Sequence, residues 1–146
     1  MAKRTKRNRW RIKEAVRVAR KAGIDAFREG AEGILTESID ETPIESGTLR
    51  RSGTVTVGGL PDGGKVFEAA EAGGEQRDAF KKELGKEKAI YISFNTPYAR
   101  RQHEELDWEH PIGGKAKYLE DPFNRLKRKV IRRAEQRIKK ALRDAE

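Results

Sequence analysis

Cysteine is absent from this chain of 146 residues, and so are long apolar runs. Without cysteine there is no disulfide framework, no thiolate nucleophile and no Cys-based zinc or iron–sulfur site. No stretch approaches the ~20 apolar residues of a membrane helix, and the basic start leads into an amphipathic segment instead of the apolar run of a signal peptide. We therefore expect a soluble, non-secreted protein that contacts no membrane and is suited to a reducing cytosol.

Apolar residues are also scarce, at 35%, whereas charged residues make up 39% of the chain. The usual charged fraction is about 25%. The length fits a single domain over residues 1–146, which would bury roughly 70% of its unfolded surface. The chain must therefore solvate or pair a great deal of charge around one modest core.

The net charge of +9 is a sum of unlike parts. Residues 1–21 hold ten Lys/Arg and one acid, residues 115–146 hold twelve and five, and residues 22–114 hold eleven and eighteen. A uniformly basic domain would favour nucleic-acid binding through phosphate neutralisation. Basic ends around an acidic middle also favour pairing within the chain or with an identical neighbour, although each exposed pair is worth at most about 1 kcal/mol.

Two segments show helical periodicity, one over residues 10–41 and one over residues 117–145. Residues 1–9 precede the first helix as a basic arm. Glycines in the first helix predict either a break or bend near Gly30–Gly33 or the close approach of a neighbouring backbone. The predicted buried stripes are Ile12, Val16, Ala19, Ala26, Phe27, Ile34, Leu35 and Ile39 in the first helix, and Leu119, Phe123, Leu126, Val130, Ala134, Ile138 and Ala141 in the second.

Period-two alternation between the helices predicts a small antiparallel sheet over residues 53–95. Its predicted strands are Thr54–Val57, Lys65–Ala69 after a glycine-rich turn, and Ala89–Phe94. The expected inward set is Val55, Val57, Ile90, Ile92 and Phe94. The fold class is therefore α+β, with this sheet packed against the two long amphipathic helices.

The charged stretch 71–88 interrupts the predicted sheet. Uninterrupted loops of this length are uncommon and usually functional or mobile. Phe80 and Leu84 have the spacing of a short helix, and a solvated excursion without a specific role is the alternative. After the last strand, Pro97–Glu105 predicts a short helix with its proline in the first turn.

Both histidines, His103 and His110, lie near the carboxylates of residues 104–109. Imidazoles and carboxylates bind zinc or a non-haem metal, but this spacing matches no established metal motif and acids are abundant throughout. A hydrogen-bonded structural role for His103 is the favoured interpretation. The sequence contains no phosphate-binding loop and no nucleophile motif, so we expect no enzyme, no cofactor and no bound metal.

The basic termini provide candidate surfaces for a partner. Trp10 fits the core or a subunit interface better than base stacking, because it begins the first helical stripe. The cations of the last helix are spread around much of its circumference. This distribution suits a solvated helix or an acidic partner slightly better than a helix that binds in a DNA groove. The candidate interface or DNA-facing residues are Arg4, Lys6, Arg7, Arg9, Trp10, Arg128, Arg132 and Arg133.

Three phrases are more informative together than any single residue. They read TPIESGTLRRS at 42–52, YARRQHE at 98–104 and GGKAKYLEDPF at 113–123. Their order and spacing resemble the tail-completion and head–tail joining (minor capsid) proteins of long-tailed bacteriophages. The resemblance covers roughly residues 10–140, and residue Ser46 and the long 71–88 stretch depart from the family's pattern.

The resemblance implies a virion structural protein of the neck, made in the host cytoplasm and located at the head–tail junction. It implies a ring, hexameric in this family, that joins the tail end to the connector, with other neck and tail proteins as partners and possible contact with packaged DNA. A tail terminator, a capsid-associated minor protein and a sequence-independent DNA-binding protein are the alternatives.

The resemblance also selects the residues expected to shape the fold. Pro43 and Gly47 should fix a turn that carries Leu49 into the core and directs Arg50 and Arg51 outward. Tyr98 should bury its ring and use its hydroxyl, and Pro122 should pin the start of the last helix. The full set is Pro43, Gly47, Leu49, Arg50, Tyr98, Ala99, His103, Glu104, Leu119 and Pro122.

Overall fold

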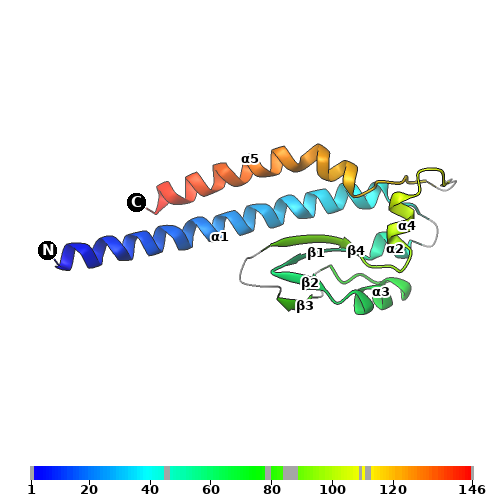
Figure 1. Ribbon diagram of the computed structural model, residues 1–146, viewed down its shortest axis with the longest axis horizontal. Helices are drawn as coiled ribbons and strands as arrows, with labels where there is room; N and C mark the ends of the chain where they lie inside the picture. Colours follow the sequence, from blue (N-terminus) through cyan, green and yellow to red (C-terminus); the bar gives the residue numbers. More distant parts are fainter. Residues whose placement is uncertain are drawn as a thin grey trace. The chain divides into compact units, whose positions relative to one another are not determined.

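The computed structural model describes residues 2–44, 47–77, 80–83, 89–108, 110 and 113–145. The chain forms two compact units, unit 1 with residues 1–29 and 127–146 and unit 2 with residues 30–126. No helix among the described residues is long and apolar enough to cross a membrane. The elements in chain order (Figure 1) are α1 (Ala2–Glu41), α2 (Thr48–Arg51), β1 (Gly53–Val57), β2 (Gly59–Pro61), α3 (Gly63–Glu71), β3 (Phe80–Glu83), β4 (Ile90–Phe94), α4 (Ala99–Glu104) and α5 (Glu120–Asp144).

The core of unit 2 lies between the second half of α1 and a two-stranded antiparallel sheet. Strands β1 and β4 pair with Val55 opposite Ile92. Gly53 permits the approach of α1, because a Cβ there would lie 2.7 Å from the Leu35 Cδ1. Ala31, Leu35 and Val55 are buried, with Ile39, Ile90, Ile92 and Phe94 packed against them. The α+β class and the two outer predicted strands are therefore confirmed.

The segment Lys65–Ala69 is part of helix α3, so the predicted strand is wrong there. The Asp62 side chain caps this helix by accepting a hydrogen bond from the Lys65 backbone N–H at 3.2 Å. Val66 and Ala70, one helical turn apart, are both fully buried. An N-cap and burial at a spacing of four thus outweigh the strand preference of Val66 and Phe67.

The charged stretch 71–88 contributes strand β3, which pairs antiparallel with β2 so that Gly59 lies opposite Glu83. The predicted short helix is therefore wrong at Phe80, and Leu84 lies outside the described residues. The pairing gives backbone hydrogen bonds to both short strands, which an isolated four-residue segment cannot supply for itself.

Helix α1 is continuous from Ala2 to Glu41. Residues 2–9 belong to it, so the predicted separate arm is wrong, and the helix does not break at Gly30–Gly33. Arg, Lys and Ala are good helix formers, and the length of the helix offsets the ~1 kcal/mol cost of each glycine. Helix α4 is present, but it begins at Ala99 with Tyr98 as its N-cap, so Pro97 precedes the helix and its predicted place in the first turn is wrong. Helix α5 begins three residues later than predicted, with Pro122 in its first turn.

In unit 1, α1 and α5 pack through small residues. A Cβ on the buried Gly23 would lie 3.3 Å from the Ile138 Cδ1. Ala26, in the next turn of α1 after Gly23, and Ala134, one turn of α5 before Ile138, are also buried. Arg137 also forms an ion pair with Glu29. Gly23 therefore leaves room for the Ile138 side chain, whereas the prediction for the glycines of this helix named a neighbouring backbone.

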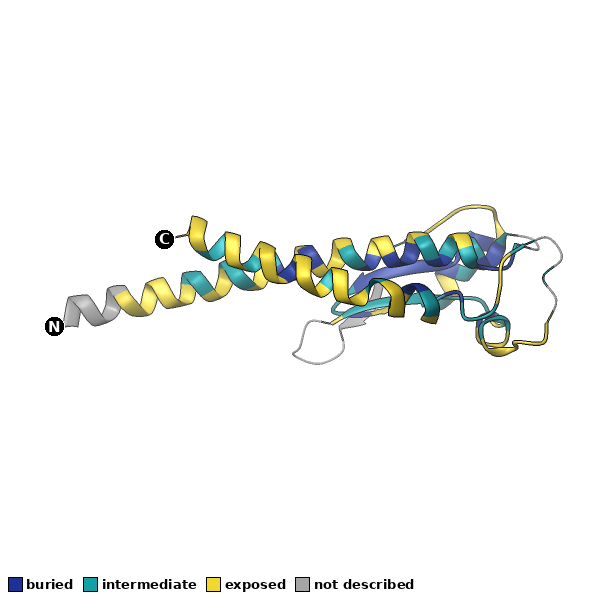
Figure 2. Cartoon of the chain, turned by 90° about the horizontal axis from the view of Figure 1, so that it is seen from above, coloured by how far each residue is buried: buried dark blue, intermediate teal, exposed yellow. Residues whose placement is uncertain are grey.

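Among the residues that the structure describes, the beginning of α1 has no such partner. Residues Arg17 and Val18 share a groove with Asp144, the last residue of α5, so α1 continues past the end of its partner (Figure 1). Ile12 and Val16 are consequently 65% and 51% exposed, and their predicted burial is wrong. Figure 2 shows the described part of α1 near the N-terminus mainly in the colour of exposed residues. The predicted burial of Phe27 and Phe123 is also wrong, since both remain substantially exposed.

We expect Asp62→Ala to lower the free energy of unfolding by about 1 kcal/mol, because it removes the cap of α3. Urea unfolding followed by far-ultraviolet circular dichroism measures this. Asp62→Asn keeps an acceptor oxygen and should stay within about 0.5 kcal/mol of the wild type. Equal losses for both variants would contradict a capping role.

Candidate functional site

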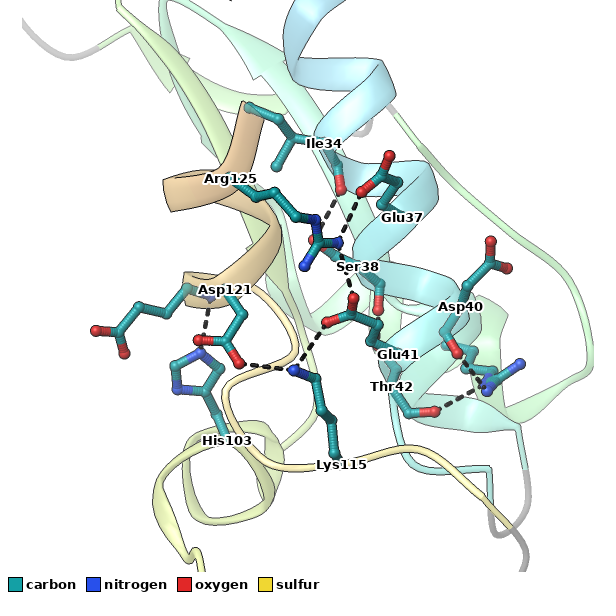
Figure 3. Close-up of polar contacts among 12 residues, drawn as sticks. Ile34, Glu37, Ser38, Asp40, Glu41, Thr42, His103, Lys115, Asp121 and Arg125 are labelled. Carbon is teal, nitrogen blue, oxygen red and sulfur yellow. Dashed lines mark hydrogen bonds and ion pairs between the residues drawn. The ribbon is translucent and has the colours of Figure 1, made fainter. Parts of the chain in front are cut away.

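The C-terminal end of α1 is the place where distant parts of unit 2 meet. A helix cannot satisfy its last backbone carbonyl groups by itself. Here the Arg50 guanidinium donates to the carbonyl oxygens of Thr42, at 2.9 Å, and Asp40, at 3.1 Å. The Lys115 backbone N–H donates to the Glu41 carbonyl oxygen at 2.9 Å. We call residues 38–43, 50, 103 and 113–125 the α1-end junction (Figure 3).

Carboxylates and cations surround the same helix end. Arg125 donates to Glu37 at 2.7 Å and to Glu41 at 2.8 Å. Lys115 lies 2.7 Å from an Asp121 oxygen and 3.5 Å from Glu41 (Figure 3). The hydrogen bond between Lys115 and Asp121 lowers the pKa of Asp121 and raises that of Lys115. Cations also suit the negative end of the helix dipole, although these exposed pairs are individually weak.

The glycines of the third phrase permit this approach. Gly114 has a φ of 86°, a conformation that favours glycine. A Cβ on Gly114 would lie 2.5 Å from the backbone of Pro43 and from the Thr42 carbonyl oxygen. Any side chain there must push the chain away from the end of α1. The first and third phrases therefore fit together through backbone contact.

Tyr118 joins the third phrase to the second. Its side chain is 1% exposed, and its hydroxyl donates to the Ala99 carbonyl oxygen at 2.7 Å. Burial raises the pKa of Tyr118 far above its ordinary value. The ring packs edge-on against Phe94 and His103. The sequence prediction gave this buried hydroxyl role to Tyr98, which is only half-buried, and the pattern contains no signal that separates the two tyrosines.

Tyr118 belongs to a second small core. Leu49, Ala99 and Tyr118 are buried together, with Phe94, Tyr98 and Leu119 packed around them. The predicted burial of Leu49 is therefore confirmed. Each of the three phrases contributes one of the buried members, so all three act in one packing unit.

His103 has the hydrogen-bonded structural role expected for it. Its Nε2 accepts a hydrogen bond from the Glu120 backbone N–H at 3.2 Å, at the start of α5. Its Nδ1 lies 2.8 Å from a Glu104 oxygen. An Nε2 that accepts leaves the ring proton on Nδ1, where it is donated to Glu104. The imidazole thus caps α5 and fixes α4 beside it.

His103, Glu104 and Glu120 place ligand-type atoms within 4.8 Å of one another. The Lys117 ammonium lies between the two carboxylates, 2.5 Å from Glu104 and 3.1 Å from Glu120. Hydrogen bonds from Lys117 and His103 lower the pKa of Glu104. The cluster is therefore an ion-pair network whose cation is a lysine of the chain, and His110 is not a member of it.

Arg50 and Arg51 point into the protein, so their predicted outward direction is wrong. Arg50 binds the end of α1, and Arg51 donates to the Ala70 carbonyl oxygen, near the end of α3, at 2.9 Å. Unsatisfied carbonyl groups at helix ends attract guanidinium donors, which the sequence pattern does not reveal. Gly47, with a φ of 77°, and buried Pro43 form the predicted turn.

The candidate interface residues lie on exposed helix surfaces. Arg9, Arg128, Arg132 and Arg133 are exposed, and Trp10 is 67% exposed, so Trp10 does not join the core of this chain. Arg4, Lys6 and Arg7 lie in α1, and their side chains are outside the described part. In unit 2, Leu106 is 72% exposed.

The charge follows the two units. Unit 1 holds 20 Lys/Arg and 6 Asp/Glu, a net charge of +14, and unit 2 holds 13 and 18, a net charge of −5. No protein-family model, curated protein or solved structure matches the chain. Function must therefore be argued from the junction, the exposed side chains and this separation of charge.

We expect Gly114→Ala to destabilise the protein much more than Gly73→Ala. The two glycines have nearly equal φ values of 86° and 87°, but a Cβ on Gly73 meets nothing within 4 Å. Gly73→Ala should lower the free energy of unfolding by about 1 kcal/mol, because alanine is disfavoured in the left-handed conformation. Gly114→Ala should lower it by about 2 kcal/mol more, because its Cβ also clashes with Pro43. Urea unfolding measures both, and equal costs would contradict the close contact.

The stability of the junction should depend on acid. Folding lowers the pKa values of Glu104 and Asp121, so their ionised forms stabilise the folded protein. This stabilisation is fully present above the ordinary carboxyl pKa of about 4, and it is lost as the pH falls through the lowered pKa values. The double variant Glu104→Gln/Asp121→Asn should therefore lose less stability between about pH 5 and pH 2 than the wild type. Urea unfolding midpoints across this range measure the effect.

The matched control is Glu105→Gln/Asp107→Asn, which changes one Glu and one Asp in the exposed loop after α4. It should keep the pH dependence of the wild type. Identical pH profiles for the wild type and the junction variant would show that the ion pairs do not couple to folding.

Proposed function

We propose that this protein is a structural subunit of a bacteriophage neck, a tail-completion or head–tail joining protein that assembles into a ring between the tail end and the connector. The observation that carries the proposal is the set of three phrases at 42–52, 98–104 and 113–123. Their residues end α1, permit the approach of Gly114 and bury Tyr118. A resemblance located in such residues concerns architecture, which supports a structural role.

Exposed apolar side chains support an assembly. About 20 Å of α1 continues beyond the end of α5, and this overhang carries Trp10, Ile12 and Val16 with exposed fractions of 67%, 65% and 51%. Apolar side chains gathered in one exposed segment are typical of interaction sites. Trp is also the residue type most often found among the energetically dominant contacts of interfaces.

The acidic loop after α4 offers a matching surface on another copy. Leu106 and Trp108 are exposed there beside Glu105 and Asp107, and the Arg101 guanidinium lies 5.3 Å from the Trp108 ring. An apolar and basic overhang on one copy complements an apolar and acidic loop on the next. A contact between two different surfaces of the same chain is heterologous, and it closes into a ring when the rotation permits.

The test is to measure the mass of the full chain in solution at moderate salt by light scattering, with electron microscopy of the particles. A closed ring, hexameric as the resemblance implies, supports the proposal, and the position of the ring in the virion separates tail completion from a tail terminator or a capsid-associated minor protein. A chain that stays monomeric with its neighbouring neck proteins, and that virions lack, contradicts it.

We expect Trp10→Ser/Ile12→Ser to weaken ring formation by at least about 30-fold, the effect of losing a dominant interface residue. Because both side chains are exposed, the free energy of unfolding should change by no more than about 0.5 kcal/mol. The control is Ile131→Ser, an equally apolar change at a residue of α5 that is 47% exposed. Unchanged assembly of the double variant would exclude the overhang as the interface.

A further inference from the structure

The exposed side of α5 in unit 1 carries a continuous basic surface. Ala134 is 1% exposed and marks the packed side of this helix. At 100° per residue, nine residues between 127 and 144 fall on the half opposite Ala134, and seven of them are cations. The other two are Gln136 and, at the margin, Glu135. We call the cations the α5 basic face: Arg128, Lys129, Arg132, Arg133, Lys139, Lys140 and Arg143.

All seven side chains are exposed, and no hydrogen bond or ion pair joins any of them to the residues that the structure describes. Arg137, outside this face, is by contrast paired with Glu29 of α1. Unit 1 holds 20 Lys/Arg and only 6 Asp/Glu, so most of its cations cannot find a carboxylate partner within the unit. The arrangement keeps this charge available to something outside unit 1.

The chemistry of the face distinguishes between two kinds of partner. Protein interfaces have an apolar centre and are depleted in lysine, but the α5 basic face contains no apolar side chain. Binding to a polyanion needs no apolar centre, because neutralising phosphates releases counterions. The apolar overhang of α1 therefore suits a protein partner, whereas the α5 basic face suits a phosphate backbone.

The dimensions favour duplex DNA. From Arg128 to Arg143 the helix rises about 22 Å, so the seven cations are spaced roughly 3 Å apart along the helix axis. Duplex DNA carries one phosphate for about every 1.7 Å of its own axis, so phosphates are available to all seven cations. The major groove of B-form DNA is about 12 Å wide and accepts an α-helix, whereas that of A-form RNA is too narrow. Cations spread over nearly half the circumference can then contact phosphates on both sides of the groove.

We propose that the α5 basic face binds the phosphate backbone of B-form DNA without sequence preference. Sequence preference requires side chains that match base edges, and Gln136 is the only amide among the nine residues of this side. The proposal goes beyond the assembly role and does not depend on it, because a monomer also presents the complete face.

The experiment titrates the full chain onto a fluorescent DNA duplex of about 20 base pairs, two helical turns, and follows anisotropy between about 50 and 200 mM salt. The wild type should bind with a slope of log K against log salt near −6, the value for about seven phosphate contacts. Duplexes of unrelated sequence should bind equally, and duplex RNA of the same length should bind more weakly.

The variant Arg132→Gln/Lys139→Gln should reduce the magnitude of the slope by about 2 and weaken binding about 60-fold at 0.1 M salt, because each contact contributes about 0.9 log unit there. The control Lys65→Gln/Arg100→Gln removes one Lys and one Arg from exposed positions in unit 2. It should bind DNA like the wild type. Gln is a good helix former, and circular dichroism verifies that both variants keep their helices.

Three results would overturn the proposal. The first is negligible binding of duplex DNA at about 50 mM salt. The second is an equal loss for the variant and its control, which would mean that only net charge matters. The third is that the variant loses self-association but not DNA binding, which would make the α5 basic face a protein interface.

Discussion

The carbonyl groups at the C-terminal end of α1 must find hydrogen-bond donors, and the rest of unit 2 is arranged around that requirement. A buried carbonyl without a partner costs about 1–3 kcal/mol, and a helix that ends beside the core presents several. Arg50 and the Lys115 backbone supply the donors. These donors are 9 and 74 residues away from Glu41 in sequence. Satisfying one helix end therefore brings both α2, which contains Arg50, and the chain before α5 to the end of α1.

The position of α5 follows from this arrangement. Gly114 permits contact with Pro43, and Tyr118 inserts between α4 and β4. His103 then caps the first residue of α5. The first turn of α5 therefore lies beside the end of α1 in unit 2. In unit 1 the groove between the two helices reaches Arg17 and Asp144, the last residue of α5, and the described side chains of Ile12 and Val16 that precede it in α1 are exposed.

The charges of the protein have two distinct uses. In the α1-end junction Lys115, Lys117 and Arg125 are matched by carboxylates, which satisfies the polar groups of a small unit with little apolar core. On the α5 basic face the cations have no described partner, and their charge is directed outward. The proposed ring contact and the proposed DNA contact therefore use separate surfaces. The first is an overhang with apolar and basic side chains, and the second is the α5 basic face, on a side of the helix without apolar side chains. Each can be removed by substitution without the other.

Hydrophobic periodicity over long segments is a local property, and it correctly predicts the α+β class, the two long helices and the paired strands β1 and β4. The sequence also identified Pro43, Gly47, Leu49 and His103, whose roles depend on local turn chemistry or on an isolated residue type. Packing in three dimensions was needed to establish that Lys65–Ala69 is helical, that Tyr118 and not Tyr98 is buried, and that Arg50 and Arg51 point inward. It was also needed to establish that Ile12 and Val16 are exposed. The helix over Lys65–Ala69 depends on its cap at Asp62 and on the burial of Val66 and Ala70. The other outcomes depend on which groups far away in the sequence lack a partner, such as a helix-end carbonyl or the end of a shorter helix. The periodicity of one segment does not contain that information.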